Sequence, residues 1–437
     1  MMKVAAYPSY SEYKPSGYEW VGDVPAHWSI EKLGTCLTAV SCKGRPDLPL
    51  LSITREEGVI ERDVDDQESN HNFIPDDLSN YKVLRAGQFG MNKMKAWQGS
   101  YGVSAHTGIV SPAYFVFDIT REVDPAFFNR TLRSKLYVSY FGSASDGVRI
   151  GQWDLSKTRM REIPVLLPSL PEQRAIAAFL DEKCAKIDDA VRIKEAQIGL
   201  LRERRQILIQ DAVTRGLNPD APMKDSGIDW IGQIPAHWEV KRLASFGSFS
   251  KGGGFSKSDL AETGTDAILY GDIYTQYDFV IDNPVRKVST NVASQSVPIY
   301  EGNLLFTGSG ETRQDIGKCV LFRGVANAVS GGDVIIFRQS QNHPLFLTFC
   351  LNSDGVVEKK AQSSKGEIIV HTYGSALKNI FIPVPPVDEQ ARIAKFIWDG
   401  IGKIEAAISI KQAQITALKE YKTCLINAAV TGKIKVT

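Results

Sequence analysis

Two histidine residues stand in matching contexts that make them candidates for acid–base chemistry. His27 precedes Trp28 and His237 precedes Trp238, and each histidine follows a Pro-Ala dipeptide. Imidazole titrates near neutral pH and is the side chain most often used as a general acid or base. A repeated histidine flanked by proline and tryptophan is, however, more typical of a structural corner, and we interpret both residues in this way.

Other catalytic patterns are incomplete. A P-loop requires G-x-x-x-x-G-K-[ST], whereas residues 310–319 have a different spacing and end in cysteine. A nuclease-like pattern places Asp220 in an interdomain turn and Glu239 where the first copy of a repeat has Ser29. Residues 384–387 (Val-Pro-Pro-Val) lack the polar and aromatic members of an adenine-methyltransferase tetrapeptide. The sequence offers no metal or cofactor site, so we expect the chemistry to belong to a partner protein.

Contact with nucleic acid explains the polar residues better than catalysis does. Between Asp77 and Asp118 a glycine-rich stretch carries cations and aromatic residues but no acid, which suits contact with phosphates and base edges. Solvated faces and ordinary turns have the same composition and are the simpler interpretation. The predicted DNA contacts of the first half are Lys93, Lys95, Trp97, Gln98, Tyr101, Ser104, His106 and Arg149. Those of the second half are Lys251, Lys257, Tyr270, Asp272, Tyr274, Gln276, Ser309, Arg313, Gln314, Lys365, His371 and Tyr373.

An internal repeat organises the chain that must position these residues. Residues 16–28 return as residues 226–238, a shift of 226 − 16 = 210, and Glu172-Gln173 returns as Glu389-Gln390, a shift of 390 − 173 = 217. Duplication sets the architecture before any single residue is interpreted. We predict the order domain, helix, domain, helix, with boundaries at residues 1–170, 171–216, 217–385 and 386–437.

Both predicted helices carry an apolar heptad seam, in which apolar residues recur at alternating steps of four and three. The predicted seam residues are Ile187, Val191, Ile198, Leu201 and Leu208 in the first helix and Ile404, Ile408, Ile415, Leu418 and Leu425 in the second. Two such seams favour packing of the two helices against each other. The alternative is that each helix packs on its own domain. The chain leaves domain one on the first helix and, if the halves are related by a pseudo-twofold axis, returns on the second. We therefore predict an α+β protein whose two α/β domains are separated by two long antiparallel coiled-coil helices.

Composition places few limits on function. The 437 residues are 43% hydrophobic, which suffices for about two to four folded domains. A formal net charge of +1 means that any contact with DNA must depend on local patches. The six scattered cysteines have no metal-ligand spacing, and no apolar run is long enough to span a bilayer. With no signal-peptide pattern at the start, we expect a cytoplasmic protein.

The ordered set of motifs resembles the specificity subunit of type I restriction-modification systems over essentially the whole chain. The resemblance lies in the two Trp-x-Gly-x-x-Pro-x-His-Trp elements, the Pro-Glu-Gln and Asp-Glu-Gln helix entries, and residues 92–99 and 108–114. It implies two target-recognition domains that each read half of a split DNA site, with the two helices fixing the spacer.

The resemblance also implies partners. Two modification subunits would bind S-adenosylmethionine and methylate adenine, and restriction subunits would supply ATP-driven translocation and cleavage. The chain itself would be the non-catalytic subunit that recognises double-stranded DNA. Two alternatives remain open: a two-headed coiled-coil scaffold that binds proteins and never contacts DNA, and a stand-alone nuclease that uses the Glu239 pattern.

Overall fold

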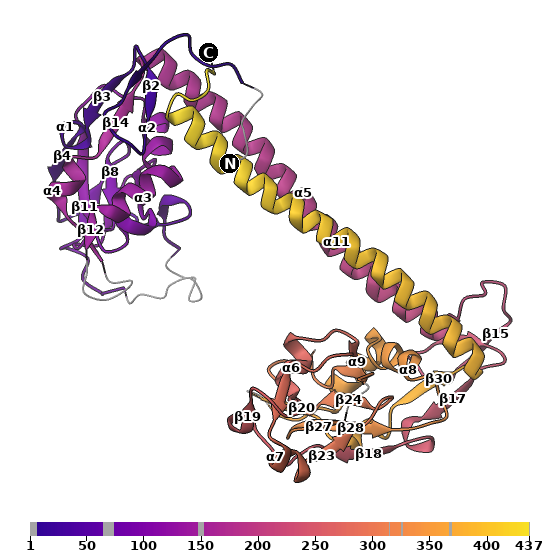
Figure 1. Cartoon of the computed structure of the whole chain (residues 1–437). Helices are drawn as coiled ribbons and strands as arrows, with labels where there is room; N and C mark the ends of the chain where they lie inside the picture. Colours follow the sequence, from indigo (N-terminus) through magenta and orange to yellow (C-terminus); the bar gives the residue numbers. More distant parts are fainter. Residues whose placement is uncertain are drawn as a thin grey trace. The chain divides into compact units, whose positions relative to one another are not determined.

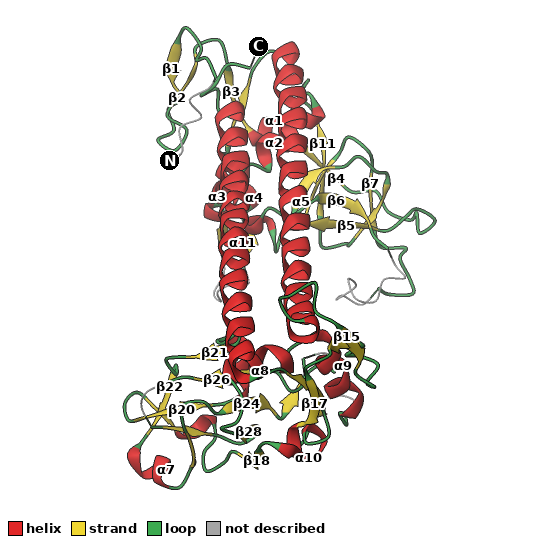
Figure 2. Cartoon of the chain, turned by 90° about the vertical axis from the view of Figure 1, so that its right-hand side faces the viewer, coloured by secondary structure: helices red, strands yellow, loops and turns green. Residues whose placement is uncertain are grey.

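The structure is a computed structural model that describes residues 7–63, 74–146, 153–313, 315–324, 327–366 and 369–436 (Figures 1 and 2). The chain divides into two compact units. Unit 1 comprises Met1–Glu195 and Gln412–Thr437, and unit 2 comprises Ala196–Lys411. Each of the two longest helices, α5 (Leu170–Arg215) and α11 (Val387–Val430), therefore contributes residues to both units.

Unit 1 contains a four-stranded antiparallel sheet of order β4-β11-β8-β9, with smaller two-stranded pairs around it. Its strands are β1 (Tyr13–Pro15), β2 (Asp23–Pro25), β3 (Ser29–Lys32), β4 (Leu37–Val40), β5 (Leu51–Thr54), β6 (Gly58–Glu61), β7 (Lys82–Leu84), β8 (Phe89–Met91), β9 (Tyr101–Val103), β10 (Gly108–Val110), β11 (Phe115–Ile119), β12 (Ser145–Asp146), β13 (Asp154–Leu155) and β14 (Pro164–Leu167). Its shorter helices are α1 (Leu33–Cys36), η1 (Ala96–Gln98), α2 (Pro125–Leu132), α3 (Lys135–Ser143) and α4 (Lys157–Arg161).

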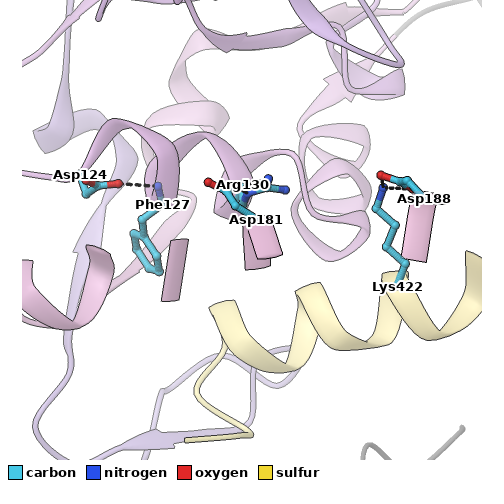
Figure 3. Close-up of polar contacts among 6 residues, drawn as sticks. All are labelled: Asp124, Phe127, Arg130, Asp181, Asp188 and Lys422. Atoms are coloured by element: carbon cyan, nitrogen blue, oxygen red, sulfur yellow. Dashed lines mark hydrogen bonds and ion pairs between the residues drawn. The ribbon is translucent and has the colours of Figure 1, made fainter. Parts of the chain in front are cut away.

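Local chemistry fixes α2 against the long helices of unit 1. The Asp124 carboxylate accepts a hydrogen bond of 2.9 Å from the backbone N–H of Phe127, which is an N-cap that satisfies a free donor of the first turn. Farther along α2, Arg130 pairs with Asp181 of α5. Lys422 of α11 lies 2.7 Å from Asp188 of α5, so these contacts tie α2 to α5 and α5 to α11 (Figure 3).

Unit 2 contains two five-stranded sheets, of order β18-β28-β24-β26-β21 and β19-β22-β20-β27-β23. Its strands are β15 (Met223–Asp225), β16 (Gln233–Pro235), β17 (Glu239–Arg242), β18 (Ser248–Lys251), β19 (Leu260–Ala261), β20 (Thr265–Ile268), β21 (Val280–Ile281), β22 (Arg286–Val288), β23 (Val297–Ile299), β24 (Leu304–Thr307), β25 (Ser309–Gly310), β26 (Cys319–Phe322), β27 (Ala328–Ser330), β28 (Val334–Arg338), β29 (Val370–His371) and β30 (Phe381–Val384). Its shorter helices are η2 (Leu243–Ser245), η3 (Lys257–Asp259), α6 (Tyr270–Thr275), α7 (Thr290–Ser294), α8 (Pro344–Leu351), α9 (Asp354–Ser363) and α10 (Gly374–Leu377).

The repeated sequence elements make the same contacts in each unit. In unit 1, β3 pairs with β14, and in unit 2, β17 pairs with β30. The Gln173 side chain donates to the carbonyl oxygen of Pro168 at 2.9 Å and accepts from the backbone N–H of Asp124 at 2.8 Å. Gln390 donates to Pro385 at 2.8 Å and accepts from His343 at 2.9 Å. The repeated glutamine therefore joins the start of each long helix to the short helix inside its unit.

The structure also reveals a repeat that the sequence comparison missed. The helix pair α2–α3 has a counterpart in α8–α9, with a constant shift of 344 − 125 = 354 − 135 = 219. Both pairs begin with proline, and a serine, Ser134 or Ser353, occupies the N-cap position of the second helix of each; of the two, the Ser134 side chain forms a capping hydrogen bond. The two units therefore share this helical corner.

The two long helices pack antiparallel to each other within each unit. In unit 1, Lys194 of α5 donates to Gln414 of α11 at 2.8 Å, and Asp188, six residues earlier along α5, pairs with Lys422 of α11. In unit 2, Arg205 pairs with Glu405 at 2.9 Å. The predicted seam is buried at Ile187, Val191, Ile198, Ile404, Ile415 and Leu425 and half-buried at Leu201, Leu208, Ile408 and Leu418. The predicted fold class, α+β units with long antiparallel helices, is confirmed.

The buried lysine of α9 predicts a pH dependence of stability. Lys360 is fully buried, and its ammonium group donates to the carbonyl oxygens of Gly317 at 2.7 Å and Leu351 at 2.8 Å. Burial lowers the pKa of Lys360 to about 8, below the ordinary lysine value. The unfolded chain therefore binds more protons between about pH 8 and pH 10.5, and this lysine makes folding stability rise with pH across that window, by roughly 3 kcal/mol in total.

We expect Lys360→Met to lack this rise. The melting temperature of the wild-type chain relative to the variant should increase between pH 7 and pH 10 in paired thermal scans, because other titrating groups cancel in the comparison. A melting-temperature difference that stays constant over this range would contradict the assignment.

Candidate nucleic-acid interface

The turn between β8 and β9 presents most of the predicted surface of unit 1. The Asn92 side chain holds the turn by accepting from the backbone N–H of Met94 and donating to the Tyr114 hydroxyl, both at 3.2 Å. Lys95 is exposed, and Lys93 forms an ion pair of 2.9 Å with Asp154. The two cations therefore stand on a turn with a fixed backbone.

The other candidates of unit 1 divide into surface and core residues. Trp97 and Gln98 are half-buried, and His106 pairs with Glu61 at 3.2 Å. Two predictions are corrected: Tyr101 is fully buried and donates its hydroxyl to the Leu132 carbonyl oxygen, and the buried Ser104 hydroxyl donates to the His106 carbonyl oxygen. Both side chains are used inside the domain, so neither is a surface contact. Arg149 lies outside the described residues.

Arg133 was missed from the sequence, although it organises this surface. Its guanidinium group donates to the carbonyl oxygens of Gly99 and Tyr101 at 3.2 and 2.6 Å, and to those of Arg55 and Glu56 at 3.1 and 2.8 Å. It thereby joins the β8–β9 turn to the β5–β6 hairpin. Basic residues near a predicted surface were interpreted from the sequence as ligand contacts. Only the fold shows that Arg133 instead donates to backbone carbonyl groups.

We expect Arg133→Lys to loosen the β8–β9 turn. A lysine cannot reproduce the planar donor fork, so several carbonyl groups lose their partner, at a cost of roughly 2–3 kcal/mol in the free energy of unfolding. Denaturant titration measures this cost. Arg121→Lys is the matched control, because Arg121 makes only a surface ion pair of 2.9 Å with Glu31. Equal stability of the two variants would contradict the proposed role of Arg133.

In unit 2 the chain brings distant predicted residues together. β25 pairs with β29, which places Ser309 opposite His371, and the Ser309 hydroxyl lies 2.9 Å from Nδ1 of His371. The backbone of His371 also exchanges hydrogen bonds with Lys365. Ser309 itself is buried, whereas Lys365 and Tyr373 are exposed.

A cavity of about 210 Å³ opens beside this strand pair. It is lined by Phe249, Ser250, Lys251, Gly308, Asp333, Ile335, His371, Thr372, Tyr373, Gly374, Ser375 and Lys378. Three of these residues, Lys251, His371 and Tyr373, were predicted contacts. Asp333 and Thr372 were missed, and the Gly331-Gly332-Asp333 tripeptide was the signal that a special backbone position lay there.

The remaining candidates of unit 2 are spread over α6 and exposed loops. Tyr270 and Gln276 are exposed. Asp272 is buried and forms an ion pair of 3.3 Å with Arg286, so the prediction of Asp272 as a surface contact is corrected. The Tyr274 hydroxyl donates toward Thr307 at 2.7 Å, and burial raises its pKa to about 12, so it is a packed phenol. Further exposed candidates are Lys257 and Arg313, and Gln314 lies outside the described residues.

The two repeated histidines occupy structural corners. His27 Nε2 lies 2.9 Å from the Glu172 carboxylate, which also accepts from Trp28 Nε1 at 3.0 Å. His237 Nε2 lies 2.8 Å from the Glu389 carboxylate, whereas the buried Trp238 Nε1 has no hydrogen-bond partner among the described residues. Each pair joins the repeated His-Trp element to the first turn of a long helix, in agreement with the structural interpretation.

Two units built on one frame, each with its own polar surface, define a tandem recognition protein. Residues 235–419 match the family model of the type I restriction modification DNA specificity domain. The chain is 25% identical over 315 residues to the type I restriction enzyme MjaVIII specificity subunit of Methanocaldococcus jannaschii, and the matched region covers 69% of this chain and 69% of that one. It is 21% identical to the putative MjaX specificity subunit of the same organism, over 95% of this chain and 96% of that one. The chain is thus similar to type I restriction-modification specificity subunits, through a family model over residues 235–419 and through relatives that match 69% and 95% of its length.

The fold agrees with this similarity. A solved chain from work on complex assembly and conformational transition of the type I R-M system superposes with a TM-score of 0.70 at 15% identity, covering 93% of this chain and 98% of that chain. Among the described residues, no helix is both long and apolar enough to cross a membrane.

Proposed function

We propose that this chain selects the DNA sequence on which a type I restriction-modification complex acts. Unit 1 and unit 2 each bind one half of a split, asymmetric site. The observation that supports this most is the duplicated frame, in which the same glutamine and His–Glu contacts recur while the polar surfaces differ: the β8–β9 turn in unit 1 and the cavity in unit 2. One frame with two surfaces suits two different half-sites.

The proposal includes partners and a division of labour. The chain has no catalytic role of its own; two methyltransferase subunits bind S-adenosylmethionine and methylate adenine, and restriction subunits translocate and cleave DNA. With a net charge of only +1, much of the phosphate contact would come from these partners. The complex would work in the cytoplasm. Residues 1–170 and 217–385 would be the recognition domains, and residues 171–216 and 386–437 the spacer helices.

We retain as proposed DNA contacts the predicted residues that are exposed or half-buried, except the half-buried Tyr274, whose hydroxyl donates to Thr307 inside the domain. In unit 1 these are Lys93, Lys95, Trp97, Gln98 and His106. In unit 2 they are Lys251, Lys257, Tyr270, Gln276, Arg313, Lys365, His371 and Tyr373. Side chains of this kind contact phosphates and base edges in nucleic-acid complexes.

Methylome sequencing tests the function directly. Cells that express this chain with its neighbouring methyltransferase subunit should acquire a split adenine-methylated motif, and cells that express either protein alone should not. If no motif appears although the complex assembles, the protein-binding scaffold becomes the better explanation. Binding of the complex to DNA should also fall steeply with salt, because neutralised phosphates release counterions.

A further inference from the structure

We propose that the ion pair formed by Lys251 and Asp333 reads one adenine of the half-site bound by unit 2. This inference depends on the proposed function and assigns a base to one of its surfaces. Lys251 ends β18, and Asp333 directly precedes the neighbouring strand β28. Lys251 Nζ lies 3.4 Å from Asp333 Oδ1, so a donor and an acceptor stand side by side at the cavity.

This pairing of one donor with one acceptor complements adenine. In the major groove adenine offers an acceptor, N7, beside a donor, its N6 amino group, whereas guanine offers two acceptors, thymine one acceptor and cytosine one donor. Carboxamide side chains read adenine because they combine a donor with an acceptor, and the lysine–aspartate pair offers the same combination. The side chains of Lys251 and Asp333 are 71% and 47% exposed, so a base edge can reach both.

The backbone holds Asp333 in an uncommon conformation. It is the only non-glycine residue with positive φ in the described part of the chain, at +59°, a conformation that costs most residues about 1 kcal/mol or more. Its carbonyl oxygen accepts a hydrogen bond of 2.6 Å from the backbone N–H of Gly308. A side chain at position 308 would place its Cβ 2.9 Å from that oxygen, so the close contact favours glycine. The backbone that carries the Asp333 carboxylate is therefore held in one position.

A second observation indicates that the same cavity receives a ligand. Thr372 is one of the lining residues, and its hydroxyl oxygen is buried with no hydrogen-bond partner within the part of the chain that the structure describes. Buried hydroxyl groups are nearly always paired in native proteins. A nucleotide bound at the cavity would supply the missing partner, and Tyr373 and Lys378 on the same lining would lie beside its sugar-phosphate backbone.

The test uses the full chain with its methyltransferase subunit in cells, read by methylome sequencing. Lys251→Met leaves only the carboxylate acceptor, so one A·T position of one half-site should accept adenine or cytosine. Asp333→Gly leaves only the lysine donor, so the same position should accept adenine, guanine or thymine, each of which presents an acceptor. The preference for adenine should fall about ten-fold or more in each variant. The position should not be the methylated adenine, because that amino group must reach the methyltransferase.

Glycine also tolerates positive φ, so Asp333→Gly should not destabilise the domain, and a thermal scan checks this. Asp333→Asn keeps an acceptor and adds a donor, so it should retain the preference for adenine. The matched control is Lys287→Met, because Lys287 pairs with Asp266 at 2.7 Å on another sheet of unit 2; its motif should match that of the wild type.

The outcomes separate the inference from the function on which it depends. A wild-type chain that yields no split motif would refute the proposed function. A wild-type motif that persists unchanged in Lys251→Met and Asp333→Gly, or that relaxes only at a G·C pair, would overturn the adenine assignment while leaving the function intact.

Discussion

Replacing Leu201 and Leu418 together by lysine is expected to separate the paired helices. Both leucines are seam residues, and both are half-buried against the neighbouring helix. An ammonium group there must lose hydration or push the helices apart, and we expect a cost of roughly 2–3 kcal/mol at each site. Circular dichroism during denaturant titration measures the loss. In the complex, the double variant should lose the fixed spacer of the methylated motif.

Neighbouring exposed positions provide the control for this experiment. Leu200 and Ile410 lie on the same two helices, yet they are 65% and 58% exposed. Leu200→Lys with Ile410→Lys adds the same charge without entering the seam, so the free energy of unfolding should change by less than about 0.5 kcal/mol. An unchanged spacer in the seam variant would rule out the helices as the element that sets it.

The seam was predictable because a heptad pattern is a property of neighbouring residues. Steps of four and three place Ile187, Val191 and Ile198 on one face of any α-helix, and all three are buried. The repeated Glu172-Gln173 element also marked the start of α5, where Gln173 donates to the Pro168 carbonyl oxygen just before the helix. Its contacts with Asp124 and His27 depend on the fold.

The cavity was only partly predictable because it depends on strand pairing. Lys251 and His371 were selected by residue type, but only the pairing of β25 with β29 and of β18 with β28 brings them together. Residue type also misled us at Tyr101 and Asp272, which have the side chains of a binding surface but lie in the interior. Asp333 was missed because an acidic residue is an unexpected DNA contact until its lysine partner is seen.

The shared helical corner was missed for a different reason. The sequences of α2 and α8 have diverged at most positions and keep mainly proline and buried apolar residues, such as Phe127 and Phe346. Many apolar residues satisfy the same core, so the contacts survive after the sequence resemblance has faded. The residue that follows α2 and the residue that follows α8 make different contacts. Arg133 donates to the β8–β9 turn, whereas the Asn352 side chain donates to the Cys319 carbonyl oxygen of β26 at 2.7 Å.

Deleting residues 431–437 is expected to destabilise unit 1 while leaving unit 2 folded. The C-terminal tail is part of the core of unit 1: Ile434 is 4% exposed, and Gly432, at φ +68°, lies against the ring of Trp28. The Tyr13 hydroxyl donates to the Gly432 carbonyl oxygen at 3.0 Å. Losing a buried isoleucine and uncovering a buried tryptophan should cost roughly 4–5 kcal/mol. Hydrogen exchange followed separately in the two units measures where protection is lost.

A circular permutant provides the matched comparison for this deletion. The backbone N–H of Lys435 donates to the Pro8 carbonyl oxygen at 2.7 Å, so a short linker can join the two ends of the chain. New ends opened between Gly216 and Met223 fall in an exposed turn. Because the permutant keeps every contact of the tail, its unit 1 should retain the protection that the deletion loses. If the deletion left protection in unit 1 unchanged, the tail would have no structural role.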